Sequence, residues 1–286
     1  MIILNAMAEK TIQIEKFNGE IEEFEVEKLK TSLRRSKATE AEIETIVAQI
    51  MPTLYDGISS KKIYSKAFSL LKKLNRISAS KYSLKRALLD LGPTGYPFER
   101  LIAALLREKG YEAEVGVILQ GECVTHEVDV LAKKDGYTYA IECKHHSDPK
   151  AVSNVRVPLY INSRFLDIQN YWNKDPKRAS FLKQGWLITN TRFSSDAIDY
   201  SECVGLQLLS WNYPKGNGLK QNIDHYALYP ITTLTLMSRY EKSLLMKDDV
   251  ILTKELNENP QALEKIGISA TRIKKILAEV KNLCLL

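Results

Sequence analysis

Apolar and polar residues alternate most regularly over residues 126–144, which read HEVDVLAKKDGYTYAIECK. Two alternating runs flank the dipeptide Asp135-Gly136, which favours the tight turn of a two-stranded β-hairpin. If these two residues form the loop, the register places Asp129 directly opposite Glu142. The pattern therefore predicts a hairpin that brings two carboxylates together.

Side chains alternate between the two faces of a strand, so this register sorts the hairpin into two sets. One face carries Glu127, Asp129, Glu142 and Lys144. The other face carries Val128, Val130, Tyr139, Ile141 and Cys143. Directly opposed side chains lie about 5 Å apart, and like charges in that position destabilise a sheet. A hard divalent cation is the simplest compensation for such a carboxylate pair.

The first third of the chain has a different pattern. Residues 11–26 alternate around Asn18-Gly19, which predicts a second hairpin. Apolar residues then recur every three or four positions, which predicts helices over residues 27–36, 40–54, 60–75 and 79–91. The breakers in LGPTGYP, residues 91–97, mark a domain boundary.

After this boundary, helical and extended patterns follow one another. The expected elements are an amphipathic helix at 98–110, a strand at 112–119, the first hairpin, a helix around 156–168, a strand at 185–190, a helix at 194–203 and a strand at 205–211. This order predicts an α/β fold, α+β for the whole chain, with a mixed sheet flanked by helices. We expect three domains, 1–92, 93–230 and a helical region at 231–286.

Composition narrows the class of protein. The chain has 286 residues and a net charge of +6, which permits a nucleic-acid partner without requiring one. Its four cysteines contain no Cys-x-x-Cys pair, as is usual for a reducing compartment. The sequence lacks an apolar run of about 20 residues and a signal-peptide pattern, so we expect a cytoplasmic protein without a membrane partner.

The first candidate site consists of Asp129, Glu142 and Lys144. Hydrolysis of a phosphodiester with metal assistance needs carboxylate oxygens for Mg²⁺ and positive charge near the reacting phosphate. A lysine beside the metal stabilises the negative charge that develops there. The alternative is a solvated sheet face on which Glu142 and Lys144 make a surface ion pair.

These residues, with Phe98-Glu99 on the preceding helix, resemble the PD-(D/E)xK nuclease core and, more narrowly, the Mrr-like restriction endonuclease family. The resemblance covers about residues 96–215 and implies a restriction-endonuclease-like fold. Val128 stands where the motif name has proline.

The resemblance also implies a role for each motif residue. Asp129 and Glu142 would bind Mg²⁺ or Mn²⁺ together with the Cys143 carbonyl. Lys144 would be the catalytic lysine, and Glu99 would be a supporting acid.

Two further groups are candidates for DNA contacts. Arg156, Tyr160 and Arg164 are spaced for one helix face, which fits phosphate contacts and equally fits ordinary surface charge. The segment KIGISATRIKKIL resembles a helix-hairpin-helix turn, with Arg272 and Lys274 adding positive charge. Plain helix packing or dimerisation is the alternative for this second group.

The N-terminal region, about residues 9–92, resembles an ATP-cone, the nucleotide-sensing module of ribonucleotide reductases and their repressors. Lys16 and Lys28 match its basic positions, and Asn18-Gly19 match its hairpin turn. ATP or dATP would then be an effector. Phe17 replaces a basic residue of the pattern, so a domain that keeps the fold without binding nucleotide is equally compatible.

Cysteine and histidine suggest a competing zinc site. Cys123 and His126, and likewise Cys143 and His146, are three residues apart. Residues three apart on a strand point to opposite faces, which argues against zinc ligation.

The sequence thus predicts a metal-dependent DNA endonuclease of restriction or defence type that forms a homo-oligomer, either a dimer or a higher assembly. The ATP-cone resemblance adds the expectation that a nucleotide regulates it. One alternative is a DNA-binding protein with a nuclease fold that does not cleave. The other is a nucleotide-gated regulator that acts through oligomerisation.

Overall fold

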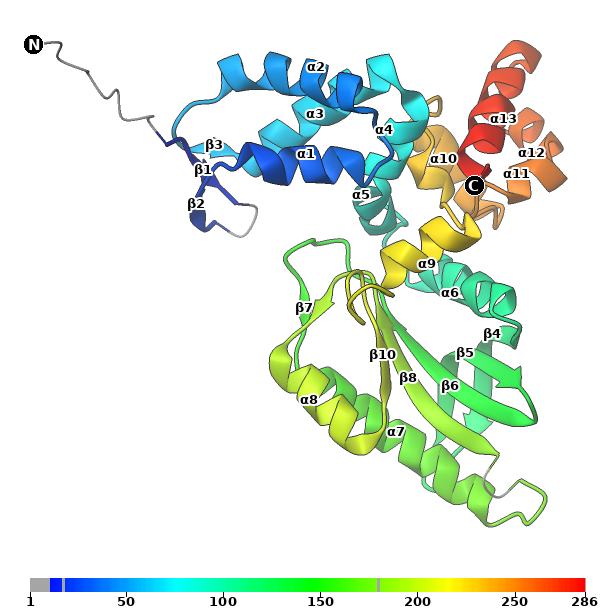
Figure 1. Cartoon of the computed structure of the whole chain (residues 1–286). Helices are drawn as coiled ribbons and strands as arrows, with labels where there is room; N and C mark the ends of the chain where they lie inside the picture. The colour runs from blue at the N-terminus through cyan, green and yellow to red at the C-terminus, as the bar shows by residue number, and fades with distance from the viewer. Residues whose placement is uncertain (1–10, 17–18, 179–180, 286) are drawn as a thin grey trace, which may run out of the picture. The chain divides into compact units, whose positions relative to one another are not determined.

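The computed structural model describes residues 11–16, 19–178 and 181–285 (Figure 1). The chain forms two compact units, Met1–Tyr82 and Ser83–Leu286, each of which has its own secondary structure. Within the described ranges, no helix is long and apolar enough to cross a membrane.

The first unit combines a small sheet with helices. Strands β1 (Gln13–Glu15) and β2 (Ile21–Glu23) form the predicted antiparallel hairpin, and Gly19 has a φ of +87°. Asn18 and Phe17 lie outside the described residues. The sequence did not predict β3 (Ile58–Ser59), which pairs in parallel with β1, because two residues are too few to show alternation.

Three helices of this unit lie near their predicted bounds, whereas the predicted helix 79–91 is divided between α4 (Arg76–Tyr82) of this unit and α5 (Leu84–Leu89) of the second unit. The helices of this unit are α1 (Val26–Arg34), α2 (Glu40–Ile50), a 3₁₀ turn η1 (Met51–Thr53), α3 (Ser60–Leu74) and α4. Their apolar faces bury a core that includes Leu33, Ile43, Ile46 and Leu71. Thr39 and Glu42 form a capping box at the start of α2, which satisfies otherwise free backbone N–H groups.

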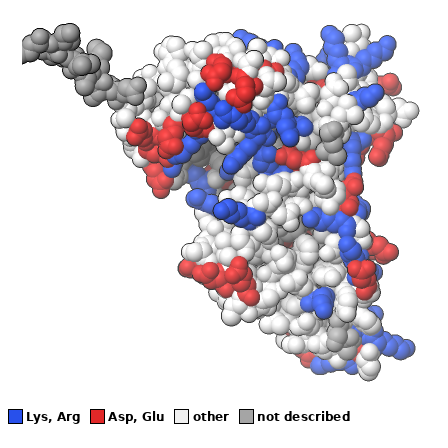
Figure 2. Space-filling view, viewed as in Figure 1, with Lys and Arg blue, Asp and Glu red and all other residues white. Residues whose placement is uncertain are grey.

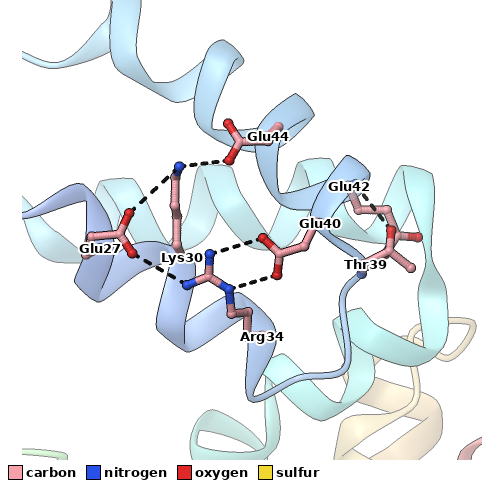
Figure 3. A network of polar contacts seen from close by, with 7 residues as sticks. All are labelled: Glu27, Lys30, Arg34, Thr39, Glu40, Glu42 and Glu44. Atoms are coloured by element: carbon pink, nitrogen blue, oxygen red, sulfur yellow. Dashed lines mark hydrogen bonds and ion pairs between the residues drawn. The ribbon is translucent and has the colours of Figure 1, made fainter.

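Ion pairs cover the outside of α1 and α2 (Figure 3). Arg34 lies 2.8 Å from Glu40 and 3.5 Å from Glu27, while Lys30 lies 2.8 Å from Glu44. Figure 2 shows basic and acidic side chains interspersed over the helices of this unit. Because these pairs are exposed to solvent, they contribute little to the free energy of unfolding.

The second unit is built on a five-stranded mixed sheet with the order β10-β8-β6-β5-β4. Its strands are β4 (Glu112–Gln120), β5 (Thr125–Lys134), β6 (Tyr137–Lys144), β8 (Leu182–Thr189) and β10 (Gln207–Leu209). Short strands β7 (Val152–Ser153) and β9 (Arg192–Phe193) form a separate parallel pair. The predicted α/β order is confirmed.

Helices cover both faces of this sheet (Figure 1). The amphipathic helix α6 (Tyr96–Glu108), which follows the short α5 (Leu84–Leu89), contacts β4, β5 and β6. Helices α7 (Arg156–Asn173) and α8 (Ser195–Val204) lie on the opposite face, where Ile161 and Ala197 pack against Leu187 of β8.

The hairpin β5–β6 has the predicted two-residue turn. Lys134 pairs with Tyr137, and the ladder continues in register to Val130 and Ile141. Asp135 and Gly136 both have positive φ angles, +52° and +80°, as this kind of turn requires.

Replacing Gly136 with Ala is expected to lower the free energy of unfolding by about 1 kcal/mol. A Cβ at this position has no neighbour within 4 Å, so the cost comes from the positive φ alone. Urea denaturation measures the change. Asp135→Gly is the matched control, and a stability of Gly136→Ala equal to that of the wild type would contradict the turn assignment.

The C-terminal part of this unit is helical, as predicted. It contains α9 (Leu219–Tyr226), η2 (Ile231–Thr233), α10 (Arg239–Lys247), α11 (Glu255–Glu258), α12 (Gln261–Lys265) and α13 (Ala270–Cys284). Glu279 is buried in α13 and accepts hydrogen bonds of 2.7 Å from both the N–H and the hydroxyl of Thr235. This contact ties the last helix to the chain before α10.

Candidate active site

The two strands of the hairpin separate at Asp129. Backbone pairing between β5 and β6 ends at Val130 and Ile141, one position short of Asp129 and Glu142. The Asp129 carboxylate instead accepts a hydrogen bond of 2.7 Å from the Cys143 N–H. The Asp129 side chain thus accepts the Cys143 N–H in place of a backbone carbonyl of β5.

Strand alternation also fails at Asp129. Val128 packs with Ala140 and with Ile168 of α7, whereas Ile141, the partner of Val130, points to the other face. On the other side of β5, the ladder with β4 omits Gly116, which stands across from Asp129 and has a φ of +68°. The prediction that Val128 and Val130 share a face is therefore wrong.

This irregularity changes the set of residues that share a face. Val128 lies on the same face of the sheet as Glu142. Because neighbouring residues of a strand point to opposite faces, Glu127 points to the other face. The predicted common face of Glu127 and Glu142 is therefore wrong as well. Irregular positions of this kind re-aim side chains and are frequent near functional sites.

Arg164 of α7 is the direct partner of Glu142. Its guanidinium lies 2.6 Å from the Glu142 carboxylate and also donates to the Glu127 carbonyl. Both side chains are largely buried, with 17% of Arg164 and 22% of Glu142 exposed. Arg164 also lies over the ring of Tyr160, 5.6 Å from its centre. Arg156, Tyr160 and Arg164 lie on one helix, as predicted, and Arg164 contacts the Glu142 carboxylate.

Three carboxyl groups at this site have raised pKa values. Burial, followed by the charge of Asp129, raises the pKa of Glu142 to about 7 even though Arg164 opposes the shift. Burial raises the pKa of Asp129, although the Cys143 N–H lowers it. Burial and the charges of Asp129 and Glu127 raise the pKa of Glu99 to about 7. Burial is therefore the main cause of the raised pKa values at this site.

Lys144 and Glu99 lie at the ends of their elements. Lys144 is the exposed last residue of β6, and its carbonyl accepts a hydrogen bond of 2.8 Å from Thr189. Glu99 lies in the first turn of α6, close to Gly95, where a Cβ would come within 2.9 Å of the Glu99 carboxylate. The sequence identified Gly95 only as a breaker, because a close approach of this kind depends on the tertiary fold.

The chemistry of the donors suits a hard divalent cation. Asp129 and Glu142 provide carboxylate oxygens and Cys143 provides a backbone carbonyl, which are ligands of the kind that Mg²⁺ prefers. Because burial raises their pKa values, the ionised carboxylates would gain from a further positive charge nearby. In the described part of the chain, no three His, Cys, Asp or Glu residues form a group that could hold an ion. Glu142 is directed toward Arg164, which supplies the counter-charge in this arrangement.

The other predicted DNA contacts have different surroundings. Arg156 and Tyr160 are exposed on α7, and Lys274 is exposed on α13. Arg272 makes two contacts with Glu241, at 2.6 and 3.1 Å, and donates to the Leu236 carbonyl. Arg272 therefore has an intramolecular role in joining α13 to α10.

In the first unit, the residues predicted to bind nucleotide converge on one acid. The ammonium groups of Lys16 and Lys28 lie 2.7 and 3.5 Å from Glu22, whose pKa is lowered mainly by its hydrogen bond with Lys16. A cavity of about 180 Å³ adjoins Lys28 and Glu22. Nucleotide binding by Lys16, Gly19, Lys28 and the undescribed Asn18 stays a prediction.

The histidines considered for zinc lie in separate places. His126 forms a 2.7 Å contact with Asp167 of α7, which also accepts the Cys123 N–H. The His146 N–H donates to the side chain of Asn190. His126 thus makes its contact near the start of β5, and His146 makes its contact just after the end of β6.

Comparisons with known proteins give two family matches. A restriction endonuclease model matches residues 93–159, and a model for the C-terminal part of AF1548-like proteins matches residues 229–284. An uncharacterized protein of Archaeoglobus fulgidus is 35% identical over 181 residues, which are 63% of this chain and 98% of that protein.

A solved structure is also similar. The crystal structure of AF1548, a protein of unknown function, superposes with a TM-score of 0.55 at 33% identity and covers 67% of this chain and 98% of that chain. Glu99, Asp129, Glu142 and Lys144 all lie inside the segment matched by the restriction endonuclease model. The sheet and its flanking helices therefore form a restriction-endonuclease-like fold.

Proposed function

Because this chain belongs to the AF1548-like family and carries a restriction endonuclease domain over residues 93–159, we propose that it is a metal-dependent DNA endonuclease of restriction type. The proposal assigns the PD-(D/E)xK motif to Asp129, Glu142 and Lys144, with Mg²⁺ or Mn²⁺ as the cofactor. Glu99 supports this motif from α6.

One observation carries the proposal: carboxyl groups with raised pKa values meet beside an exposed lysine inside the matched domain. Burial raises the pKa of both Asp129 and Glu142, and the charge of Asp129 raises the pKa of Glu142 further. Perturbed carboxyls of this kind are typical of functional sites. A solvated sheet face would leave both groups near their ordinary pKa values.

Each residue then has a defined chemical role. A bound divalent cation supplies Lewis acidity and lowers the pKa of a water molecule. Asp129, Glu142 and the Cys143 carbonyl would hold that cation. Lys144 would place positive charge beside the phosphoryl oxygens as negative charge develops on them. Glu99, with a pKa of about 7, can exchange a proton near neutral pH.

Incubation with supercoiled plasmid tests the function. The full chain is expected to nick or linearise DNA with Mg²⁺ or Mn²⁺ and to stop when EDTA is added, because the carboxylates alone cannot stabilise the transition state. Asp129→Asn should lose the activity, while Glu114→Gln, which removes an exposed carboxylate of the neighbouring strand β4, should keep it.

The possible outcomes separate the proposal from its main alternative. If DNA is retained on the protein in EDTA but is not cut with any divalent metal, the protein is a DNA-binding module with a nuclease fold. Equal cutting by Asp129→Asn and wild type would disprove the site assignment.

A further inference from the structure

We propose that a cavity between residues 90–97 and α10 binds one nucleotide of the DNA substrate, with the phosphate on a basic wall and the base on an apolar wall. The inference rests on the proposed function, since it concerns the path of the same DNA strand. The cavity has a volume of about 640 Å³, which lies in the usual range for small-molecule sites. Both of its walls belong to the second unit.

Three basic residues of α10 form one wall, namely Arg239, Lys242 and Lys247. Arg239 and Lys247 are exposed, and the ammonium group of Lys242 is fixed 2.9 Å from the Thr232 carbonyl. Three cationic side chains that line one side of a cavity favour a phosphate group over a neutral ligand.

Two acids close to this wall are paired with other residues. Asp90 lines the cavity, but it lies 2.9 Å from Arg86, which compensates its charge. Glu241 lies between Arg239 and Lys242 in the sequence, but its carboxylate is held by Arg272 at 2.6 Å. The basic wall therefore keeps its positive character.

The opposite wall offers apolar and aromatic surface. It includes Pro93, Tyr96 and Pro97, and Met246 adds apolar surface from α10. Tyr96 is 46% exposed, and its hydroxyl lies within 3.4 Å of Arg100, which limits its rotation. A tyrosine ring of this kind stacks on nucleobases without reading their sequence.

The cavity is connected to the candidate active site through α6. Tyr96 and Pro97 line the cavity, and Glu99 follows in the same first turn, which spans about 5 Å along the helix axis. Nucleotides of one DNA strand follow each other every ~3.4 Å along a duplex axis. A strand whose phosphate lies at Asp129 and Glu142 would therefore bring a nearby nucleotide to Tyr96.

Binding in EDTA, where cleavage cannot occur, tests the inference. The probes are a fluorescein-labelled single-stranded 12-mer and free dAMP, each titrated with the full chain. The combined variant Arg239→Gln and Lys247→Gln is expected to weaken 12-mer binding at least tenfold and to lower the slope of log affinity against log salt by about 1–2. Tyr96→Ala should weaken it about tenfold through lost stacking.

The matched control is Lys133→Gln with Lys177→Gln, which removes the same charge from exposed positions that do not line this cavity. This variant should change 12-mer binding less than twofold. Thermal denaturation of each variant verifies that the fold is kept.

The outcomes distinguish the two sources of a nucleotide. Loss of 12-mer binding in the cavity variants supports the inference, whether or not dAMP also binds. If the cavity variants weaken binding of dAMP but not of the 12-mer, the inference is overturned, and the cavity binds a free nucleotide instead of the DNA strand. Unchanged binding of both probes would overturn the inference. Because no step requires cleavage, a failure of the proposed nuclease activity would be seen separately in the plasmid assay.

Discussion

Replacing Glu142 with Gln is expected to increase the free energy of unfolding at pH 8 and to abolish DNA cleavage. The folded protein raises the pKa of Glu142 from 4.5 to about 7, so folding forces an unfavourable charge into the site above pH 7. Glutamine removes this charge and can still accept a hydrogen bond from Arg164. The gain should be on the order of 1–3 kcal/mol in EDTA.

The sign of the pH dependence follows from the direction of this shift. Because the folded protein binds the Glu142 proton more tightly than the unfolded chain does, this group contributes to stability in full below pH 4.5. The contribution is lost as the pH rises through about 7. Urea denaturation should therefore show a large difference between variant and wild type at pH 8 and almost none at pH 4.5.

A matched control makes this result specific. Glu114→Gln removes an exposed carboxylate and should leave stability within about 0.5 kcal/mol of the wild type at both pH values. Adding Mg²⁺ at pH 8 should stabilise the wild type but not Glu142→Gln. A Glu142→Gln protein that is less stable at pH 8 would show that the Arg164 ion pair outweighs burial.

Replacing Lys144 with Met is expected to lower the rate of DNA cleavage by a factor of about 10²–10³ without changing stability. Lys144 is exposed at the end of β6, so its ammonium group contributes little to packing. Its charge lowers the pKa values of Asp129 and Glu142, and we expect its main effect when a phosphate lies at the site and negative charge develops. Single-turnover cleavage of a labelled duplex at saturating Mg²⁺ measures this rate.

Lys133→Met provides the comparison for this variant. Lys133 is an exposed lysine of the same hairpin, near its closed end, and its loss removes the same charge. Its cleavage rate should stay within about threefold of the wild type. Equal losses in both variants would mean that Lys144 acts through general DNA attraction.

Short-range features of the fold were predictable from the sequence. The two-residue turn at Asp135-Gly136 and the register up to Val130 and Ile141 follow from turn chemistry and alternation, and both are confirmed. The helix that carries Glu99 follows equally well from its apolar periodicity. These features depend on interactions between residues close in sequence.

Features that depend on tertiary contacts were not predictable. The change of face at Asp129 requires its side chain to bind the Cys143 N–H, and Gly116 accommodates the irregularity from the neighbouring strand. The pairing of Arg164 with Glu142 joins a helix to a strand across 22 positions of the sequence. No periodic pattern encodes either contact.

The C-terminal segment also contacts the helix that carries Glu99. Arg100, the next residue of α6, pairs with Asp249 and lies 3.6 Å from Glu255, while Thr232 donates a 2.8 Å hydrogen bond to the Ala87 carbonyl. Helix α13 in turn holds the chain before α10 through Glu279. A protein shortened before residue 230 would keep every residue of the hairpin motif and lose the scaffold that orients the acid beside it. We therefore expect DNA cleavage to require the chain as far as the last helix.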